Sequence, residues 1–153
     1  NYAPISEWSP ILKIPDVTFI NLQYKDFADD LAKVKDEFGV TVHNFEDLDQ
    51  YNNVDDVAAL CAALDVVAST KVTPPFISSG VGTQTIIANW KQSAYNNFLN
   101  NPVTSSFEMH DRNLWETWDN VFNSIAENII SGGVAPIYTP SATRPSILII
   151  MCL

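Results

Sequence analysis

The sequence alternates short runs of β-branched and aromatic residues with stretches whose apolar residues recur at helical spacing. The short runs predict strands, because side chains of that shape suit a pleated, half-buried surface. The helical stretches lie between consecutive runs, so the chain repeats a strand, helix, strand unit. Such units predict right-handed crossovers and a mostly parallel sheet with helices on both faces. We therefore expect an α/β protein with a Rossmann-like, three-layer αβα fold.

The individual elements follow from the same patterns. The predicted strands are residues 17–24, 40–45, 65–70 and 83–89, and the predicted helices are residues 5–14, 26–39, 54–64, 74–79 and 113–131. In the second of these helices, apolar residues recur on one face and Gly39 follows, where a left-handed cap belongs. Residues 90–112 show neither periodicity and are predicted to form a long loop.

The length of 153 residues predicts one domain, because single cores typically occupy about 100–200 residues. We place this domain at residues 1–130. Residues 131–144 are rich in proline, glycine, serine and threonine, and residues 147–153 form a final apolar run. We expect residues 131–153 to be a linker and the start of a truncated following segment. The chain is thus predicted to be part of a longer protein, with an incomplete active site of its own.

The charge balance bears on possible partners. With 18 acidic and 8 basic side chains, the net charge is −10, which repels phosphate backbones and anionic lipids. We therefore expect no nucleic-acid partner. The apolar run 147–153 is far shorter than the ~20 residues that span a bilayer, so no membrane insertion is expected. Cys61 lies in an apolar stretch, and two cysteines form no disulfide framework, which favours a cytoplasmic setting.

The candidate ligand site follows the third predicted strand. Ligands of open parallel sheets bind beyond the carboxyl ends of the strands, where helix N-termini attract phosphate. Here Ser69, Thr70, Lys71 and Thr73 supply three hydroxyls and an ammonium just before the helix that starts at residue 74. A diphosphate suits such a loop. The alternative is a polar turn that binds only water, since glycine-rich phosphate motifs are missing and two prolines remove N–H groups.

Three stretches together resemble a known family. They are the segment Pro-Asp-Val-Thr-Phe-Ile-Asn-Leu-Gln-Tyr at residues 15–24, the segment from Phe45 to Asp65, and residues 66–82 leading into residues 85–88. This pattern is similar to the C-terminal lobe of bacterial GT-B glycosyltransferases, related to heptosyltransferases, that often follow tetratricopeptide repeats. The likeness runs from about Trp8 to Ile129. It implies a lobe that binds a nucleotide-sugar donor and needs no metal or other cofactor, beside neighbouring domains of the parent chain.

In that family, the loop after the third strand faces the diphosphate of the donor, which implies the same role for the loop 69–73. The family usually has Asp or Asn followed by Thr there, and a histidine at the start of the next helix. This chain has Lys71, Val72 and Phe76 instead, while the closing glycine is kept at Gly82. These departures favour an alternative, a degenerate lobe that serves as a protein-interaction module. A flavodoxin-like regulatory domain is a third and weaker hypothesis.

Other polar and aromatic groups are given structural interpretations. Five carboxylates between residues 46 and 56 fail the spacing of a calcium loop, and we expect them to be solvated rather than to bind a metal. His43 and His110 are expected to have no catalytic role. Aromatic side chains in the predicted loop suit either stacking on a base or sugar, or packing of the loop; they are Trp90, Tyr95, Phe98 and Phe107.

Overall fold

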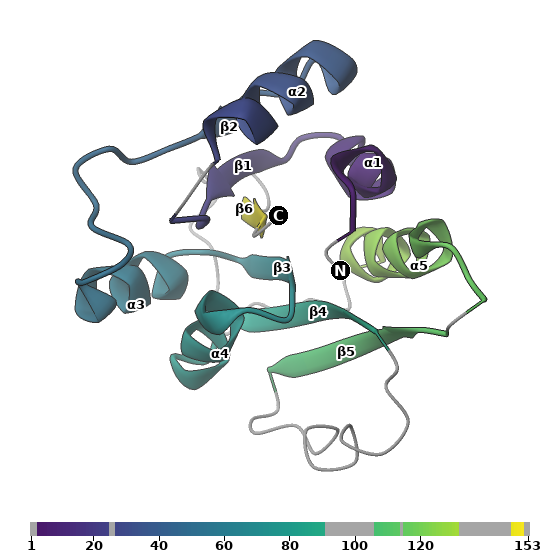
Figure 1. Ribbon diagram of the computed structural model, residues 1–153. Helices are drawn as coiled ribbons and strands as arrows, with labels where there is room; N and C mark the ends of the chain where they lie inside the picture. The colour runs from purple at the N-terminus through teal and green to yellow at the C-terminus, as the bar shows by residue number, and fades with distance from the viewer. Residues whose placement is uncertain (1–2, 25–26, 91–105, 114, 132–147, 152–153) are drawn as a thin grey trace.

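The computed structural model describes residues 3–24, 27–90, 106–113, 115–131 and 148–151. Within them, six strands run parallel to one another (Figure 1). They are β1 (Thr18–Asn21), β2 (Val42–His43), β3 (Val66–Thr70), β4 (Gln84–Trp90), β5 (Phe107–Arg112) and β6 (Leu148–Met151). The backbone pairing gives the orders β2-β1-β6 and β3-β4-β5, and β6 also lies beside β3. The predicted parallel α/β class is confirmed.

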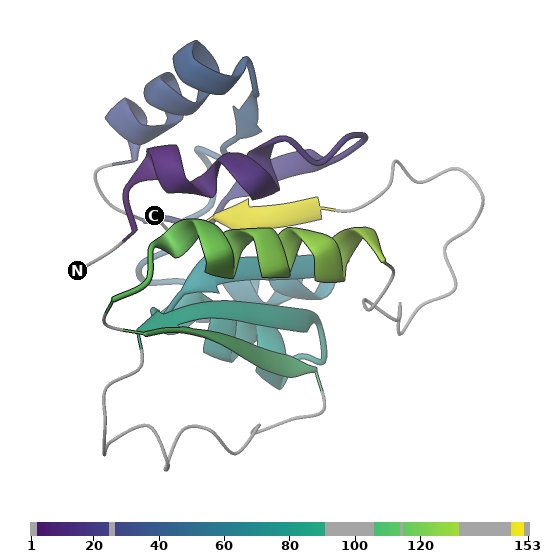
Figure 2. The ribbon, with the colours of Figure 1, turned by 90° about the vertical axis from the view of Figure 1, so that its right-hand side faces the viewer.

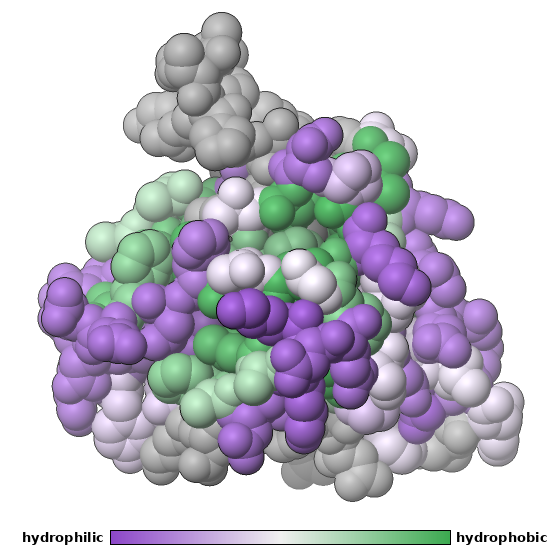
Figure 3. All heavy atoms as spheres, turned by 90° about the horizontal axis from the view of Figure 1, so that it is seen from above, coloured by the Kyte–Doolittle hydropathy of each residue, from purple (hydrophilic) through white to green (hydrophobic). Residues whose placement is uncertain are grey.

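Helices cover both faces of the strands, which gives three layers (Figures 1 and 2). The helices are α1 (Ser9–Leu12), α2 (Ala28–Phe38), α3 (Val54–Ala62), α4 (Thr73–Gly80) and α5 (Trp118–Ile130), with a 3-10 turn, η1 (Ile5–Trp8), before α1. Helices α1 and α5 pack together on one face, while α3 and α4 lie on the other. Helix α2 lies beside β2, and its hydrophilic outer side is seen in Figure 3.

Two hydrophobic clusters hold the layers together. The larger one lies under α1 and α5 and is centred on Trp8 and Phe122, whose ring centroids are 4.4 Å apart. The smaller one lies under α3 and includes Cys61. Neighbouring residues of β3 belong to different clusters, Val66 to the larger one and Val67 to the smaller one. This alternation of side chains along a strand is what lets a central strand support helices on both faces.

The observed elements differ from the predicted ones mainly near the ends. Residues 107–112, predicted as part of a loop, form strand β5, which pairs with β4. Helix α5 begins at Trp118, later than predicted, because the Asn113 N–H donates to Glu116 Oε2 within a preceding turn (3.1 Å). The left-handed cap at Gly39 is confirmed, with φ at 68°.

The final apolar run of the chain contains a strand. Strand β6 pairs with β1 over four residues, from Thr18 with Leu148 to Asn21 with Met151. Residues 148–151 therefore belong to the same parallel arrangement as β1. The domain boundary at residue 130 stays a prediction. The predicted linker, residues 131–144, lies almost wholly outside the described residues.

The burial of Cys61 yields the first testable prediction. Its side chain is fully buried, and desolvation raises the pKa of the thiol to about 11. Because the thiolate is the reactive form, we expect iodoacetamide to modify Cys61 at about pH 8 roughly 100-fold more slowly in the folded chain than in urea. Mass spectrometry of a Cys152→Ser variant isolates this thiol. Equal rates with and without urea would contradict the buried position.

Candidate functional site

The carboxyl edge of the parallel strands is where the fold places the predicted ligand loop. The arrow of β6 points to this edge in Figure 2. After β1 the chain crosses to β2, and after β3 it crosses the other way to β4. A ligand crevice is expected where the chain leaves neighbouring strands in opposite directions. Here β6 occupies the position between those two strands, so the edge is formed by the ends of β1, β6 and β3.

The four predicted site residues divide into two pairs. Ser69 and Thr70 end β3 and are 1% and 5% exposed, and Ser69 Oγ donates to the Thr70 carbonyl (2.8 Å). Lys71 and Thr73 are exposed, the first just after the strand and the second as the first residue of α4. Of the four residues expected to face one ligand together, only two are therefore exposed. Lys71 and Thr73 are the pair that a solvated diphosphate would meet.

The N-terminus of α4 is only partly available to an anion. Val72 precedes the helix in an extended conformation and its side chain makes no capping hydrogen bond. Among the first four helical residues, Pro74 and Pro75 lack an N–H group, so Thr73 and Phe76 are the two donors left. This helix end can hold one anionic group, with fewer donors than a glycine-rich phosphate loop provides.

A cluster of amide side chains around the buried Asn21 lies at the end of β1, next to the same edge. Asn21 is 1% exposed, and its Nδ2 atom donates to the Gln23 carbonyl (3.0 Å) and to Asn44 Oδ1 (2.9 Å). Its Oδ1 atom accepts from the Gln23 N–H (2.9 Å). Gln50 Nε2 donates to the Asn21 carbonyl (3.3 Å). The cluster fixes the segments that follow β1 and β2 relative to each other, and so shapes this part of the edge.

An arginine is held at the far end of the same edge. The Arg112 guanidinium lies 4.5 Å from the centroid of the Trp90 ring and 4.8 Å from that of Trp118. Its Nη1 atom donates to the Glu116 carbonyl (2.8 Å). Two aromatic faces and a carbonyl therefore stabilise this cation. Its positive charge remains close to where β5 ends.

Neither the amide cluster nor the arginine was predicted from the sequence. In both cases the central residue is a polar one near the carboxyl end of a strand. Asn89 has the same position in β4, and its Nδ2 atom donates to Asp111 Oδ1 (2.7 Å). Polar residues at the ends of successive apolar runs are the signal that points to such positions. Arg112 could not be recognised in this way, because β5 has few apolar residues and was not predicted as a strand.

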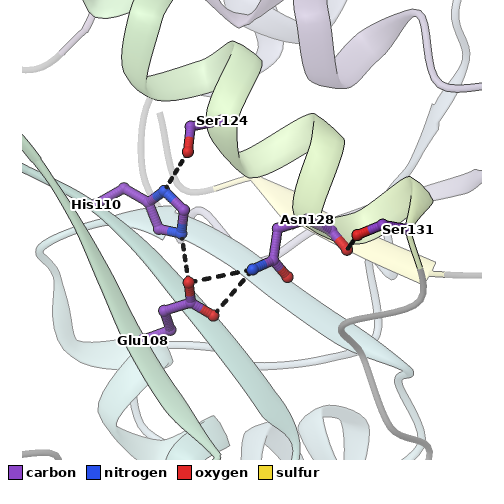
Figure 4. Close-up of polar contacts among 5 residues, drawn as sticks. All are labelled: Glu108, His110, Ser124, Asn128 and Ser131. Atoms are coloured by element: carbon purple, nitrogen blue, oxygen red, sulfur yellow. Dashed lines mark hydrogen bonds and ion pairs between the residues drawn. The ribbon is translucent and has the colours of Figure 1, made fainter.

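His110 takes part in a hydrogen-bonded cluster between β5 and α5 (Figure 4). His110 Nε2 lies 2.8 Å from Glu108 Oε1, and Nδ1 lies 3.1 Å from Ser124 Oγ. Since a carboxylate only accepts, Nε2 is the donor to Glu108, and Nδ1 is the ring atom that contacts the Ser124 hydroxyl. Asn128 Nδ2 donates to both oxygens of Glu108 (3.1 and 3.2 Å). These contacts fasten the strand β5 to α5.

Two of the four aromatic residues from the predicted loop lie among the described residues. Phe107 packs against Phe76 with ring centroids 5.7 Å apart, and Trp90 packs on Arg112, so both contribute to packing. Tyr95 and Phe98 lie outside the described residues.

The acidic residues 46–56 are exposed. Asp49 accepts from the N–H groups of Tyr51 and Asn52 and from Asn52 Nδ2. The hydrogen bonds from Asn52 hold the pKa of Asp49 below its ordinary value. The described residues include no group of three or more His, Cys, Asp or Glu side chains placed to hold a metal ion. Every helix in the described segments is too short or too polar to cross a membrane.

Comparison with known proteins gives one informative relative. The chain is 32% identical over 119 residues to Protein FlbA of Caulobacter vibrioides. The matched region covers 75% of this chain and 20% of FlbA, so the chain spans about a fifth of the length of that relative. No family model matches the chain, and no solved structure matches it.

Proposed function

We propose that this chain is the donor lobe of a GT-B-type glycosyltransferase, which binds a nucleotide-sugar within a longer protein. The observation that carries the proposal is the exposed ammonium of Lys71, which follows a central parallel strand and precedes the uncapped N-terminus of α4. In the described part of the chain, no carboxylate forms an ion pair with Lys71. Its charge is thus available to an anionic ligand.

The chemistry that such a site performs is electrostatic. When the bond between sugar and diphosphate breaks, negative charge accumulates on the leaving diphosphate. Lys71 and the N–H groups of Thr73 and Phe76 would stabilise this charge, because preorganised donors act most strongly where charge develops. The base that activates the acceptor would come from another region of the parent protein. A relative five times longer than the matched region is compatible with this arrangement.

Calorimetric titration with UDP, GDP, ADP and CDP tests the proposal. We expect one of the four to bind at micromolar strength, and Lys71→Ala to weaken its binding about tenfold or more, since a hydrogen bond to a charged group contributes about 1.5–3 kcal/mol. Lys33→Ala, on the exposed side of α2, is the matched control and should leave binding unchanged. Because Lys71 is exposed, the free energy of unfolding should not change either. Equal affinity of the Lys71 variant and the unmodified chain would refute the assignment.

A second candidate is a non-catalytic lobe that acts as a protein-interaction module. It is favoured by the burial of Ser69 and Thr70 and by the two prolines at the start of α4, which together leave few donors for a diphosphate. The same titration separates the two candidates. Absence of binding by all four nucleotides would favour the interaction module.

A further inference from the structure

An open apolar hollow lies between the segment after β2 and helix α3. It has a volume of about 290 Å³ and is lined by Phe45, Asp47, Leu48 and Leu60. Nearly all of the lining surface is apolar. The Phe45 side chain is 47% exposed although it contributes to the lining. The hollow is therefore an unfilled apolar depression on the surface, separate from Lys71 and α4.

Exposed apolar and aromatic residues occur close to the hollow in the sequence. Tyr51 and Val54 are 63% and 57% exposed, and the Tyr51 ring pairs with that of Tyr24, with centroids 5.5 Å apart. Tyr24 is itself 46% exposed. Leaving several large apolar side chains in water is unfavourable, and their occurrence in one segment favours a site of association there.

The same segment is strongly acidic. Five exposed carboxylates occur in it, and they belong to Glu46, Asp47, Asp49, Asp55 and Asp56. No lysine or arginine occurs between Lys35 and Lys71. In the described structure, none of these carboxylates forms an ion pair with a lysine or arginine. Asp47 lines the hollow, and the other four carboxylates occur close to it in the sequence; we call these five residues the acidic border.

We propose that this hollow and its acidic border bind an amphipathic helical segment of a partner protein, with leucine-like residues on one face and lysine or arginine on the other. The apolar face would bury Phe45, Leu48 and Leu60, and the basic residues would lie over the carboxylates. Opposite charge selects this partner, because an acidic or phosphate-bearing partner would be repelled. A second copy of the chain is disfavoured, because a two-fold interface would bring the same acidic border against itself.

Fluorescence anisotropy with two labelled peptides tests the proposal on the full chain. The first is a helix of about four turns with leucine on one face and lysine on the other, and the second carries glutamate in place of every lysine. We expect the lysine peptide to bind and the glutamate peptide to bind at least about tenfold more weakly. Phe45→Ala should weaken the lysine peptide about tenfold, because apolar anchors contribute most of the binding free energy.

Substitutions in the acidic border and matched controls complete the test. Asp47→Asn with Asp55→Asn should weaken the lysine peptide about threefold to tenfold, and added salt should reduce that difference. Asp119→Asn and Trp115→Ala, which alter exposed residues of another region, should have no effect. Equal binding of both peptides, an equal effect of Asp119→Asn, or no effect of Phe45→Ala would overturn the proposal. So would a dimer of the chain, seen by sedimentation, that Phe45→Ala disrupts.

Discussion

Replacing Phe122 by alanine is expected to lower the free energy of unfolding by about 3–5 kcal/mol. Phe122 is fully buried between Trp8 and Trp118, at centroid distances of 4.4 and 5.9 Å. The truncation removes the contacts of a whole ring and leaves a cavity that two rigid indole rings cannot fill by small shifts. Because Trp8 ends η1, just before α1, the truncation would weaken the packing of α5 against the N-terminal helices.

Urea unfolding followed by tryptophan fluorescence measures this loss directly. For a chain of this size the change corresponds to a fall in the melting temperature of roughly 6–20 °C. Trp115→Ala is the control, because Trp115 is 87% exposed and its removal should change the free energy of unfolding by less than about 0.5 kcal/mol. A loss below about 1 kcal/mol for Phe122→Ala would mean that this aromatic cluster does not hold α5 to the strands.

The second large change in the free energy of unfolding is expected for Asn21, which lies at the carboxyl edge beside the candidate site. Asn21→Ala removes three hydrogen bonds from a position that is 1% exposed. It also leaves Asn44 Oδ1 and the Gln23 N–H without this partner. A stranded buried polar group costs about 1–3 kcal/mol, and because Asn44 and Gln23 are half-buried, we expect a total loss of about 1–3 kcal/mol in the free energy of unfolding. Asn120→Ala, at an exposed position of α5, should be close to neutral.

A double-mutant cycle can isolate the contact between Asn21 and Asn44. Urea unfolding of Asn21→Ala, Asn44→Ala and the double variant should give a coupling energy of about 0.5–1.5 kcal/mol. The cycle also bears on ligand binding, because this contact fixes the segments after β1 and β2 at the carboxyl edge. If the energies of the two single variants simply add, the hydrogen bond between these amides contributes nothing to the arrangement of the edge.

Much of the fold could be predicted from the sequence, because its strongest elements have a clear period. Val66 to Thr70 form a run of small and β-branched residues, and both faces of the strand are buried. The apolar residues of α5 recur at helical spacing, and that face is buried, as it is for Val121, Phe122 and Ile125. In both elements, the spacing of apolar residues in the sequence is enough to predict whether one face or both faces are buried.

The elements that escaped prediction depend on partners distant in the sequence. Strand β5 reads Phe-Glu-Met-His-Asp-Arg, in which only Phe107 and Met109 are apolar, so its alternation is too short to stand out from a loop. Its conformation is stabilised by pairing with β4 and by the Glu108 and His110 contacts to α5. Edge strands of this kind are half solvated, so their polar residues carry no periodic signal.

The candidate site stays a prediction, and the structure adds how far each of its four residues is exposed. Lys71 and Thr73 are exposed as expected, whereas Ser69 and Thr70 are buried in the strand. The sequence cannot distinguish a hydroxyl that faces a ligand from one that bonds to a neighbouring carbonyl, as that of Ser69 does. The amides of Asn21 and Asn44 meet across 23 residues, and such a contact leaves no local trace.

The place of β6 has a consequence for the order of folding. This strand comes last among the described strands in sequence, yet it lies between β1 and β3. The pair β1-β2 and the trio β3-β4-β5 can each form from segments that are close in the sequence. They can be joined into one arrangement only after β6 has been synthesised. Closing so long a loop is entropically costly and slows folding. Until that step, each half exposes an unpaired strand edge, and the nascent chain is then most open to misassembly.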